Sequence, residues 1–377
     1  MANTPLGILD LVPVASGSTA PEALRNSIDL ARHAERLGYA RYWFAEHHLN
    51  PGVASTSPAV VLALTAAATS TIRIGSGAVQ LGHRTALSTV EEFGLIDALH
   101  PGRLDLGLGR SSGRPSSHAP VPALTTSASG AGGGQAPDGL LIPPRFSAEQ
   151  LLKSQRFELQ RALLQFPNAE PPDYGQQVDD ILSLLCGNYT SPDGIEAHAI
   201  PGEGAQVQVW ILGSSGGESA QVAGRHGLRF TANYHFSPAT VLEAVDGYRA
   251  AFRPSAELAR PYVSVSADVV VAESEATARE LASGYGLWVH SIRSGAGAIP
   301  FPAPAQARSH TWTPEEWALV ADRVGTQFTG SPRQVADKLE HLRDATGADE
   351  LIITTITHEH ADRTRSYELL AQEWSRR

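Results

Sequence analysis

The chain contains 377 residues, of which 42% are hydrophobic and 18% charged, a composition typical of a globular protein with a sizeable core. Its net charge of −10, from 29 basic and 39 acidic side chains with no Lys/Arg-rich block, argues against nucleic-acid and anionic-membrane partners. The start carries no basic signal-peptide region, and no apolar run approaches the roughly 20 residues that span a bilayer, so we expect a cytoplasmic protein.

Short, continuously apolar runs rich in β-forming residues alternate with helical patterns along the chain. The predicted strands cover residues 6–14, 42–46, 72–80, 104–109, 207–213, 228–232, 262–272 and 350–357. Strands without polar alternation are typical of a parallel sheet that is covered on both faces. Eight such strands, each followed by a helix, predict an α/β fold of the (β/α)8 TIM-barrel type, with residues 1–377 forming a single domain. A doubly wound open sheet is the alternative that periodicity alone does not exclude.

The second predicted strand ends in three ionisable side chains, Glu46, His47 and His48. Parallel α/β proteins carry their chemistry at such strand ends, and imidazole suits proton transfer near neutral pH. A metal site that also uses His358 and His360 is an alternative, as is a pair of loop histidines without a role. Adjacent histidines on an extended segment point to opposite sides, however, and no H-E-x-x-H spacing is present, so we predict no bound metal.

Glycine-rich stretches lie in the third and fourth predicted strands. Gly75 and Gly77 fall inside a strand pattern, which is typical of a bulge or of a ligand pressed against the backbone. Residues 107–113 lack the G-x-G-x-x-G spacing and no helix follows them, so they do not form a dinucleotide fingerprint. Arg110, at the end of this strand, is a candidate phosphate clamp, with a surface salt bridge as the alternative.

Two segments interrupt the repeat of strand and helix. Residues 111–144, rich in Gly, Ser and Pro, are expected to form a mobile insertion at the C-terminal mouth, and residues 294–310 a second mobile loop. Each is either a lid over the mouth or plainly disordered. Helices are expected at 147–166 and 175–187, and the single cysteine, Cys186, lies in the apolar pattern of the latter and is expected to be buried.

Residues 213–219 (GSSGGES) join the fifth predicted strand to a helix. Glycines permit close approach of a ligand, serine hydroxyls donate hydrogen bonds, and a helix N-terminus offers free N–H groups to an anion. The pattern therefore predicts a phosphate-binding segment. An ordinary Ser/Gly turn that caps the helix is the alternative.

Taken together, these motifs resemble the bacterial luciferase-like family of flavin-dependent monooxygenases. The resemblance runs from the first strand to the C-terminus, apart from the 111–144 insertion. The stretches that carry it are WFAEHH at 43–48, IGSGAV at 74–79, HPGRLDLGLGR at 100–110, WILGSSGGESA at 210–220 and GSPRQVADKL from 330 onward. It implies a (β/α)8 barrel, usually dimeric, that binds FMN at its C-terminal mouth.

The resemblance also implies roles for individual residues. His47 corresponds to the catalytic histidine, with His48 and Glu46 shaping the same pocket. A non-proline cis peptide bond between Gly77 and Ala78 would lie under the flavin ring. The other cofactor-binding positions that it implies are Arg110, Gly213, Ser214, Ser215 and Ser219 around the phosphate, and Tyr234 beside the ring or the substrate.

The activity implied by this resemblance is oxygenation of a small organic substrate. A separate NAD(P)H:flavin reductase would supply reduced FMN, which reacts with O2 to form the C4a-(hydro)peroxyflavin that transfers the oxygen atom. An aromatic polyketide of secondary metabolism is the suggested substrate class, and a homodimer is expected. Gly109 stands where luciferase itself has a reactive cysteine, so light emission is not inferred. The alternatives are an F420-dependent oxidoreductase on the same barrel, a non-catalytic flavin-binding accessory subunit and a metal-dependent barrel hydrolase.

Overall fold

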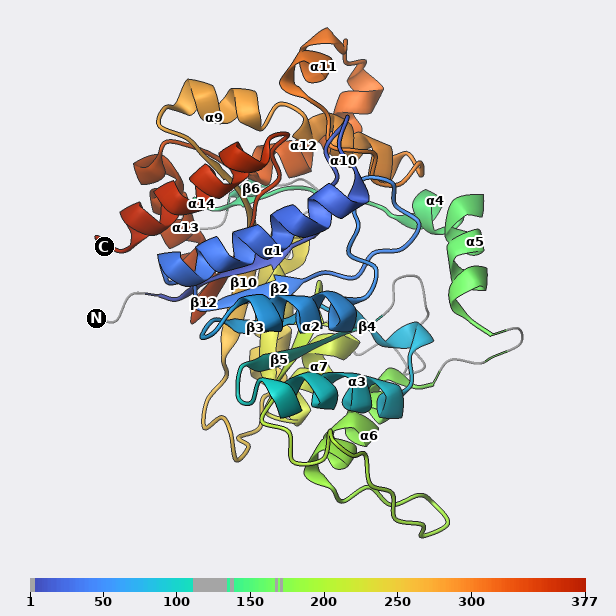
Figure 1. Ribbon diagram of the computed structural model, residues 1–377. Coiled ribbons are helices and arrows are strands. Elements are labelled where there is room, and N and C mark those ends of the chain that lie inside the picture. The colour runs from blue at the N-terminus through green and yellow to red at the C-terminus, as the bar shows by residue number, and fades with distance from the viewer. Residues whose placement is uncertain (1–3, 111–133, 136–138, 167–168, 170–171) are drawn as a thin grey trace.

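Eight parallel strands close into a barrel (Figure 1). The computed structural model describes residues 4–110, 134–135, 139–166, 169 and 172–377. The barrel strands, in spatial order, are β1 (Leu6–Asp10), β2 (Arg41–Phe44), β3 (Arg73–Ser76), β5 (Leu104–Gly109), β8 (Gln208–Gly213), β9 (Arg229–Asn233), β10 (Val263–Val271) and β12 (Glu350–Thr354). Pairing of β12 with β1 closes the ring, and every neighbouring pair is parallel. The predicted (β/α)8 fold is confirmed, and the open sheet is excluded.

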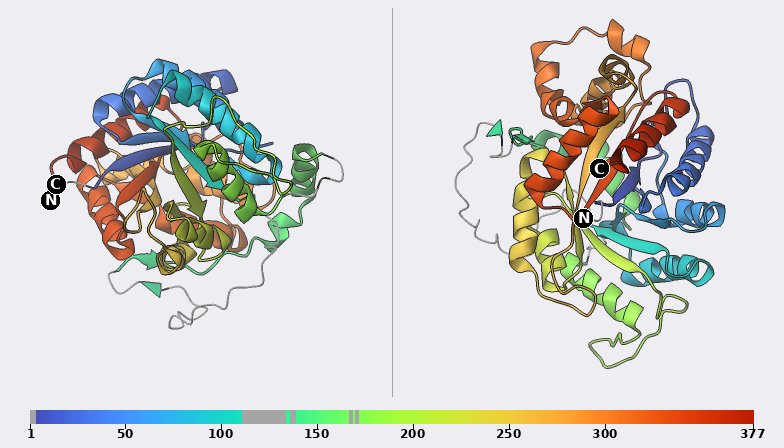
Figure 2. Two further views of the ribbon diagram at one scale, coloured as in Figure 1. Left: turned by 90° about the horizontal axis from the view of Figure 1, so that it is seen from below. Right: turned by 90° about the vertical axis from the view of Figure 1, so that its left-hand side faces the viewer.

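Helices surround the strands, as the left view of Figure 2 shows. The helices that belong to the strand–helix repeat of the barrel are α1 (Ala20–Leu37), α2 (Pro58–Ala68), α3 (Ala86–Leu99), α6 (Tyr174–Cys186), α7 (Glu218–Arg225), α8 (Val241–Ala251), α13 (Pro332–Thr346) and α14 (His360–Trp374). The additional helices are α4 (Glu149–Leu152), α5 (Gln155–Leu164), α9 (Glu275–Leu281), α10 (Tyr285–Arg293), α11 (Pro304–Ser309) and α12 (Pro314–Thr326). Short accessory elements are β4 (Val79–Gln80), β6 (Gly134–Gln135), β7 (Leu141–Ile142), β11 (Phe328–Gly330) and the 3-10 turns η1 (Leu81–His83) and η2 (Pro238–Thr240).

Two strands stop earlier than the apolar pattern predicts. β1 ends at Asp10 because the Asp10 carboxylate accepts the backbone N–H of Val12 at 2.7 Å and Val12 has a positive φ of 52°. The predicted strand 72–80 is divided into β3 and β4 by a cis peptide bond between Gly77 and Ala78. Both early strand ends lie at the C-terminal end of the barrel.

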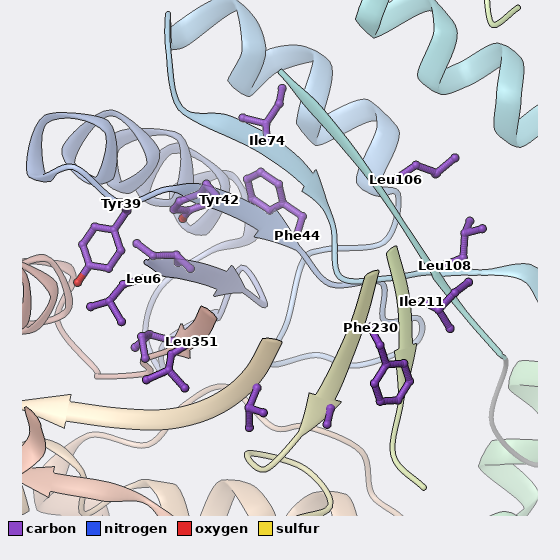
Figure 3. Packing of buried hydrophobic residues seen from close by; sticks show 14 of the residues in the cluster. Leu6, Tyr39, Tyr42, Phe44, Ile74, Leu106, Leu108, Ile211, Phe230 and Leu351 are labelled. Atoms are coloured by element: carbon purple, nitrogen blue, oxygen red, sulfur yellow. The ribbon is translucent and has the colours of Figure 1, made fainter. Parts of the chain in front are cut away.

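Side chains along the barrel strands alternate between the helical layer and the barrel interior. Outward residues such as Tyr42, Leu106 and Ile211 join one large cluster with the surrounding helices (Figure 3). The interior is filled by a second set, here called the inner cluster. Its members are Leu9, Leu11, Trp43, Ala45, Val53, Trp210, Tyr285, Trp288, Val289, Ala298, Phe301, Val320, Ile352 and Ile356. Because α10, α12 and residues 298–301 contribute to this cluster, they cover part of the C-terminal mouth.

Residues 294–310, expected as a mobile loop, are held over the mouth by backbone hydrogen bonds. Phe301 is fully buried and pairs with the backbone of Ala15 and Val14, while Gly52 donates its N–H to Ala298 at 2.7 Å. The segment also contains α11. The Gly/Pro content of this segment suggested a loop, but its hydrophobic side chains and backbone hydrogen bonds hold it against the barrel. Its mobility stays a prediction.

The N-terminal end of the barrel holds buried charges. The Arg41 guanidinium is bound by the carboxylates of Asp105 and Glu350, and all three side chains are almost fully buried. Arg73 pairs with Asp105 from the other side at 2.7 Å, and Tyr262 donates to Glu350 at 3.1 Å. Each buried carboxylate therefore has a charged partner and additional hydrogen bonds.

Other predictions have mixed outcomes. The helices expected at 147–166 and 175–187 are present as α4, α5 and α6, but Cys186 is exposed on α6, so its predicted burial is wrong. Most of the 111–144 insertion lies outside the described residues. Leu140, near its end, is buried. Among the described residues, no helix has both the length and the apolar character needed to cross a membrane.

Candidate active site

The strand alternation of β2 continues beyond its end and divides the three ionisable residues between two sides. Ala45 belongs to the inner cluster, so Glu46 and His48 point away from the barrel axis, whereas His47 lies on the same side of the chain as Ala45. The His47 backbone N–H donates to the Ser55 carbonyl at 2.8 Å, which holds this extended segment against the following turn. The histidines diverge, as their adjacency in the sequence predicted.

Glu46 forms the centre of a buried polar cluster. Its Oε1 atom lies 3.0 Å from His48 Nε2, 2.9 Å from His83 Nε2 and 3.3 Å from Arg84 Nη2, and its Oε2 accepts the backbone N–H of Gln80 at 2.9 Å. Burial raises the pKa of Glu46, but the hydrogen bonds from His48 and His83 and the charge of Arg84 outweigh it and lower the pKa to about 2. Glu46 is therefore a permanent anion that joins the end of β2 to the turn after β4.

The same three residues, Glu46, His48 and His83, have ligand atoms within 4.8 Å of one another. Two imidazoles and a carboxylate are a set that a divalent cation would accept. Here the Arg84 guanidinium already contacts the carboxylate oxygen, so a cation would be placed beside a fixed positive charge. The arrangement favours an ion-paired structural cluster, and the absence of a metal stays a prediction.

His47 is held apart from this cluster. Its Nδ1 atom is buried and has no hydrogen-bond partner among the described residues. Burial, together with the charge of His48, lowers the pKa of His47 to about 4 despite the opposing effect of Glu46. The imidazole is therefore neutral near pH 7, with an orphan nitrogen and a ring able to accept or donate a proton.

Glycines allow close packing around the Gly77–Ala78 bond, which follows β3. The Gly77 N–H donates to the Phe44 carbonyl at 2.7 Å, and a Cβ added at Gly77 would lie 2.7 Å from Leu9 Cδ1. A Cβ at Gly109 would lie 3.0 Å from the Cβ of Ala78. The cis bond that the resemblance implied between Gly77 and Ala78 is present, on a stretch where any larger side chain would fill the space.

The candidate phosphate-binding residues lie together at neighbouring strand ends. Pairing of Gly109 with Leu212 brings Arg110 beside the 213–219 segment, and Arg110 Nη1 lies 3.2 Å from Glu218 Oε2 at the start of α7. Close packing of this segment on α8 requires glycine, because a Cβ at Gly247 would lie 2.6 Å from the Gly216 Cα. The structure thus brings Arg110 together with Gly213, Ser214, Ser215 and Ser219 on the β5–β8 side of the mouth.

Tyr234 is fully buried in the large cluster that joins the strands to the surrounding helices. Its hydroxyl donates to the Leu141 carbonyl at 2.9 Å, and its ring packs near Phe328. A contact of Tyr234 with ring or substrate stays a prediction. The neighbouring His235 is oriented differently, with Nδ1 2.6 Å from Ser266 Oγ on the inner side of β10. Sequence reasoning missed His235, although a histidine directly after a strand is the same signal that identified His47.

Known proteins share the sequence of this chain over most of its length. The family model for luciferase-like monooxygenases matches residues 4–120 and 185–350. YvbT of Bacillus subtilis (strain 168) is 36% identical over 379 residues, which cover 100% of this chain and 98% of that protein. The chain belongs to the luciferase-like monooxygenase family.

Further relatives agree with this family assignment. A luciferase-like monooxygenase of Escherichia coli (strain K12) is 32% identical over 96% of this chain and 94% of its own length. The solved structure of apo-MsnO8 has a TM-score of 0.78 at 29% identity and covers 99% of this chain and 98% of that chain.

More distant structures show the fold of this luciferase-like monooxygenase with different cofactors. The oxygenating constituent of 3,6-diketocamphane monooxygenase from Pseudomonas putida, in complex with FMN, has a TM-score of 0.65 at 16% identity over 99% of both chains. An F420-dependent secondary alcohol dehydrogenase has a TM-score of 0.59 at 12% identity, again over 99% of both chains. The family fold therefore accommodates a flavin or F420.

Proposed function

We propose that this luciferase-like monooxygenase binds reduced FMN and uses O2 to oxygenate a small organic substrate. The observation that carries the proposal is the setting of His47, a neutral imidazole whose buried Nδ1 has no partner among the described residues. It follows β2, which pairs with β3 directly before the Gly77–Ala78 bond. The bound reduced flavin would supply the two electrons that leave one oxygen atom of O2 in the substrate and the other in water.

The residues of the mouth fit such a cofactor. A planar ring would lie against the backbone of the Gly77–Ala78 stretch, whose opposite side packs on Leu9 so closely that a Cβ at Gly77 would collide with it. Arg110 and the serines of residues 213–219 would hold the phosphate. The Arg110 guanidinium would leave Glu218 and bind the phosphate, which carries the stronger charge. His47 would hold or move a proton at the ring edge, and the inner cluster would exclude water.

A separate NAD(P)H:flavin reductase would supply the reduced FMN, since the sequence has no nicotinamide fingerprint. An aromatic polyketide intermediate remains our suggested substrate class, and a cytoplasmic location remains a prediction. F420 is the second candidate cofactor because a neighbour with this fold is F420-dependent. The short serine segment and single clamp Arg110 favour the short phosphate of FMN. Retention of His47 argues against a non-catalytic accessory subunit.

Anaerobic titration of the protein with reduced FMN tests this proposal. We expect saturable binding, and we expect Arg110→Ala to weaken it about 10- to 100-fold because a charge-assisted contact to the phosphate is lost. The exposed Arg365 on α14 gives the control variant Arg365→Ala, which should bind as the wild type does. Oxygen-18 from O2 should then appear in the product of a single turnover.

The outcomes separate the candidates. Tight binding of F420 with weak binding of reduced FMN would overturn the FMN proposal in favour of hydride transfer. Reduced FMN that binds but never yields labelled product with any substrate tried would point to the accessory subunit. Equal affinity of Arg110→Ala and the wild type would remove Arg110 from the phosphate site.

We also propose a homodimer that buries an apolar surface on α2 and α3, which lie side by side (Figure 1). Val60 and Leu64 on α2 and Leu95 and Leu99 on α3 are each at least 56% exposed. Exposed apolar side chains clustered on neighbouring helices are typical of an interface.

Leu64→Lys should convert a dimer into a monomer, because two buried charges would face each other across the interface. Sedimentation velocity measures this change. Leu159→Lys, on α5 and 54% exposed in the wild type, is the matched control and should leave the dimer intact. A wild-type chain that sediments as a monomer at high concentration would contradict the proposal.

A further inference from the structure

His235 lies at the end of β9 and is fixed by a single residue of β10. Its backbone N–H donates to the Ser266 carbonyl at 3.0 Å, and its Nδ1 lies 2.6 Å from the Ser266 hydroxyl. Ser266 is 1% exposed, and its other acceptor neighbours, the Ala232 carbonyl and Asn233 Oδ1, are farther away at 3.4 and 3.5 Å. Because Nδ1 already contacts Ser266, Nε2 is the ring nitrogen with which His235 can bind a ligand.

His235 and His47 share the mouth. Burial, followed by the positive charges of Arg323 and His47, lowers the pKa of His235 to about 3. The two imidazoles follow β9 and β2 at the same, C-terminal end of the barrel. Near pH 7 both imidazoles are neutral, so they give the mouth polar groups without adding charge.

The surroundings of His235 are aromatic and electrically compensated. The ring of Phe236, 56% exposed, lies 6.5 Å from the His235 ring, and the Arg323 guanidinium lies 5.7 Å from the Phe236 ring. Arg323 is itself bound to Asp268 at 3.3 Å and to the Tyr285 hydroxyl at 2.6 Å. An anionic substrate group would compete with Asp268 for this guanidinium, whereas a neutral hydroxyl would need only the imidazole.

We propose that His235, positioned by Ser266, binds a hydroxyl group of an otherwise apolar, aromatic substrate through Nε2 and orients that substrate toward His47. The proposal deepens the monooxygenase function and rests on it for the direction of oxygen transfer. The hydrogen bond itself is independent of the cofactor. A site with few polar groups in an aromatic setting is typical of small-molecule recognition, and a single fixed hydrogen bond confers selectivity there.

Binding of simple probes to the cofactor-free protein tests the inference. Phenol, 2-naphthol and anisole are titrated into protein labelled with nitrogen-15 at histidine, and the imidazole resonances are followed by NMR. We expect phenol to bind about tenfold more tightly than anisole, its O-methyl ether, and to shift the His235 Nε2 resonance. The preference should vanish in His235→Phe, which keeps an aromatic ring but has no nitrogen.

Ser266 is a positioning residue, so its variants need a separate readout. Ser266→Ala should shift the His235 Nδ1 resonance and reduce the phenol preference, and Ser266→Thr should restore both because it keeps the hydroxyl. His341→Phe, at an exposed position on α13, is the control and should behave as the wild type does. A phenol preference that persists in folded His235→Phe, or no binding of either hydroxyl probe to the wild type, would overturn the inference.

The parallel titration with reduced FMN keeps the two proposals apart. Phenol selectivity without FMN binding would leave the inference standing and remove the proposed cofactor. Binding of FMN without phenol selectivity would support the proposed cofactor and overturn the inference.

Discussion

Replacing His47 with alanine should lower the rate of substrate oxygenation by about 100- to 10,000-fold, the range expected for the loss of a group that moves a proton. The reason lies in its setting. His47 is a neutral imidazole at the end of β2, and its Nδ1 has no partner among the described residues. His48 and His83 each have a ring nitrogen bound to Glu46, and His235 has its Nδ1 bound to Ser266.

The measurement is a single turnover with reduced FMN, oxygen-18 and a substrate that the wild type oxygenates, followed by mass spectrometry of the product. Reduced FMN should bind His47→Ala within about threefold of the wild type, since no charged contact to the phosphate is removed. His341→Ala serves as the control at an exposed position. If His47→Ala kept more than about a tenth of the wild-type rate, a proton-transfer role would be wrong.

Arg41→Met should destabilise the barrel by about 3–5 kcal/mol at pH 7, because it leaves buried carboxylates without their shared partner. Arg41 lies between Asp105 and Glu350, and its guanidinium also lies 4.6 Å from the centre of the Trp210 ring. Methionine keeps much of the volume but no charge, so Glu350 would retain only the hydrogen bond from Tyr262.

The loss of stability in Arg41→Met should be smaller at lower pH. Burial raises the pKa of Glu350 even with Arg41 present, so the folded state binds a proton more readily than the unfolded state does. Above the ordinary carboxyl pKa, such a group costs stability as the pH rises, and removing Arg41 enlarges this cost. Urea unfolding at pH 7 and pH 5 measures both values.

The exposed ion pair of Arg260 with Asp349, at 2.8 Å, provides the matched comparison. Arg260→Met should change the free energy of unfolding by no more than about 1 kcal/mol, as for most surface pairs. Equal losses in the two variants, or a larger loss for Arg41→Met at pH 5 than at pH 7, would contradict the assigned role of the buried charges.

Much of the barrel was predictable from the sequence because its strands are short apolar runs separated by helices with clear caps. The α1 helix begins with a capping box at Thr19 and Glu22 and ends at Gly38 with φ of 80°, both common signals of helix ends. The strand ends were less predictable. The Asp10 carboxylate accepts the N–H two residues on, a turn that aspartate favours, but the apolar run that continues beyond it favoured a longer strand.

The candidate site was predictable where position in a strand decided it. His47 and the 213–219 segment follow strands directly, and the alternation of side chains explains why His47 is separated from Glu46 and His48. Tyr234 and His235 show a limit of this reasoning. Beyond the last ladder pair, a turn decides which of two successive side chains faces the barrel interior, and here Tyr234 is buried in the large cluster while His235 contacts Ser266.

Partners from distant parts of the chain were out of reach of sequence reasoning. His83 and Arg84 bind Glu46 from a turn 37 and 38 residues away, and Arg323 approaches Phe236 from α12. These contacts depend on how separate elements pack, which no local pattern specifies.

The connection between β10 and β12 has a role distinct from that of the other loops. The candidate chemical groups lie at the ends of β2, β3, β5, β8 and β9, whereas α10, α12 and Phe301, which cover the mouth, all belong to that one connection. The candidate chemical groups and the residues that cover the mouth thus belong to separate stretches of the chain. Substitutions in the covering stretch can retune which molecules are admitted while the reacting groups stay in place, so one inherited barrel can acquire new substrates without a new reaction.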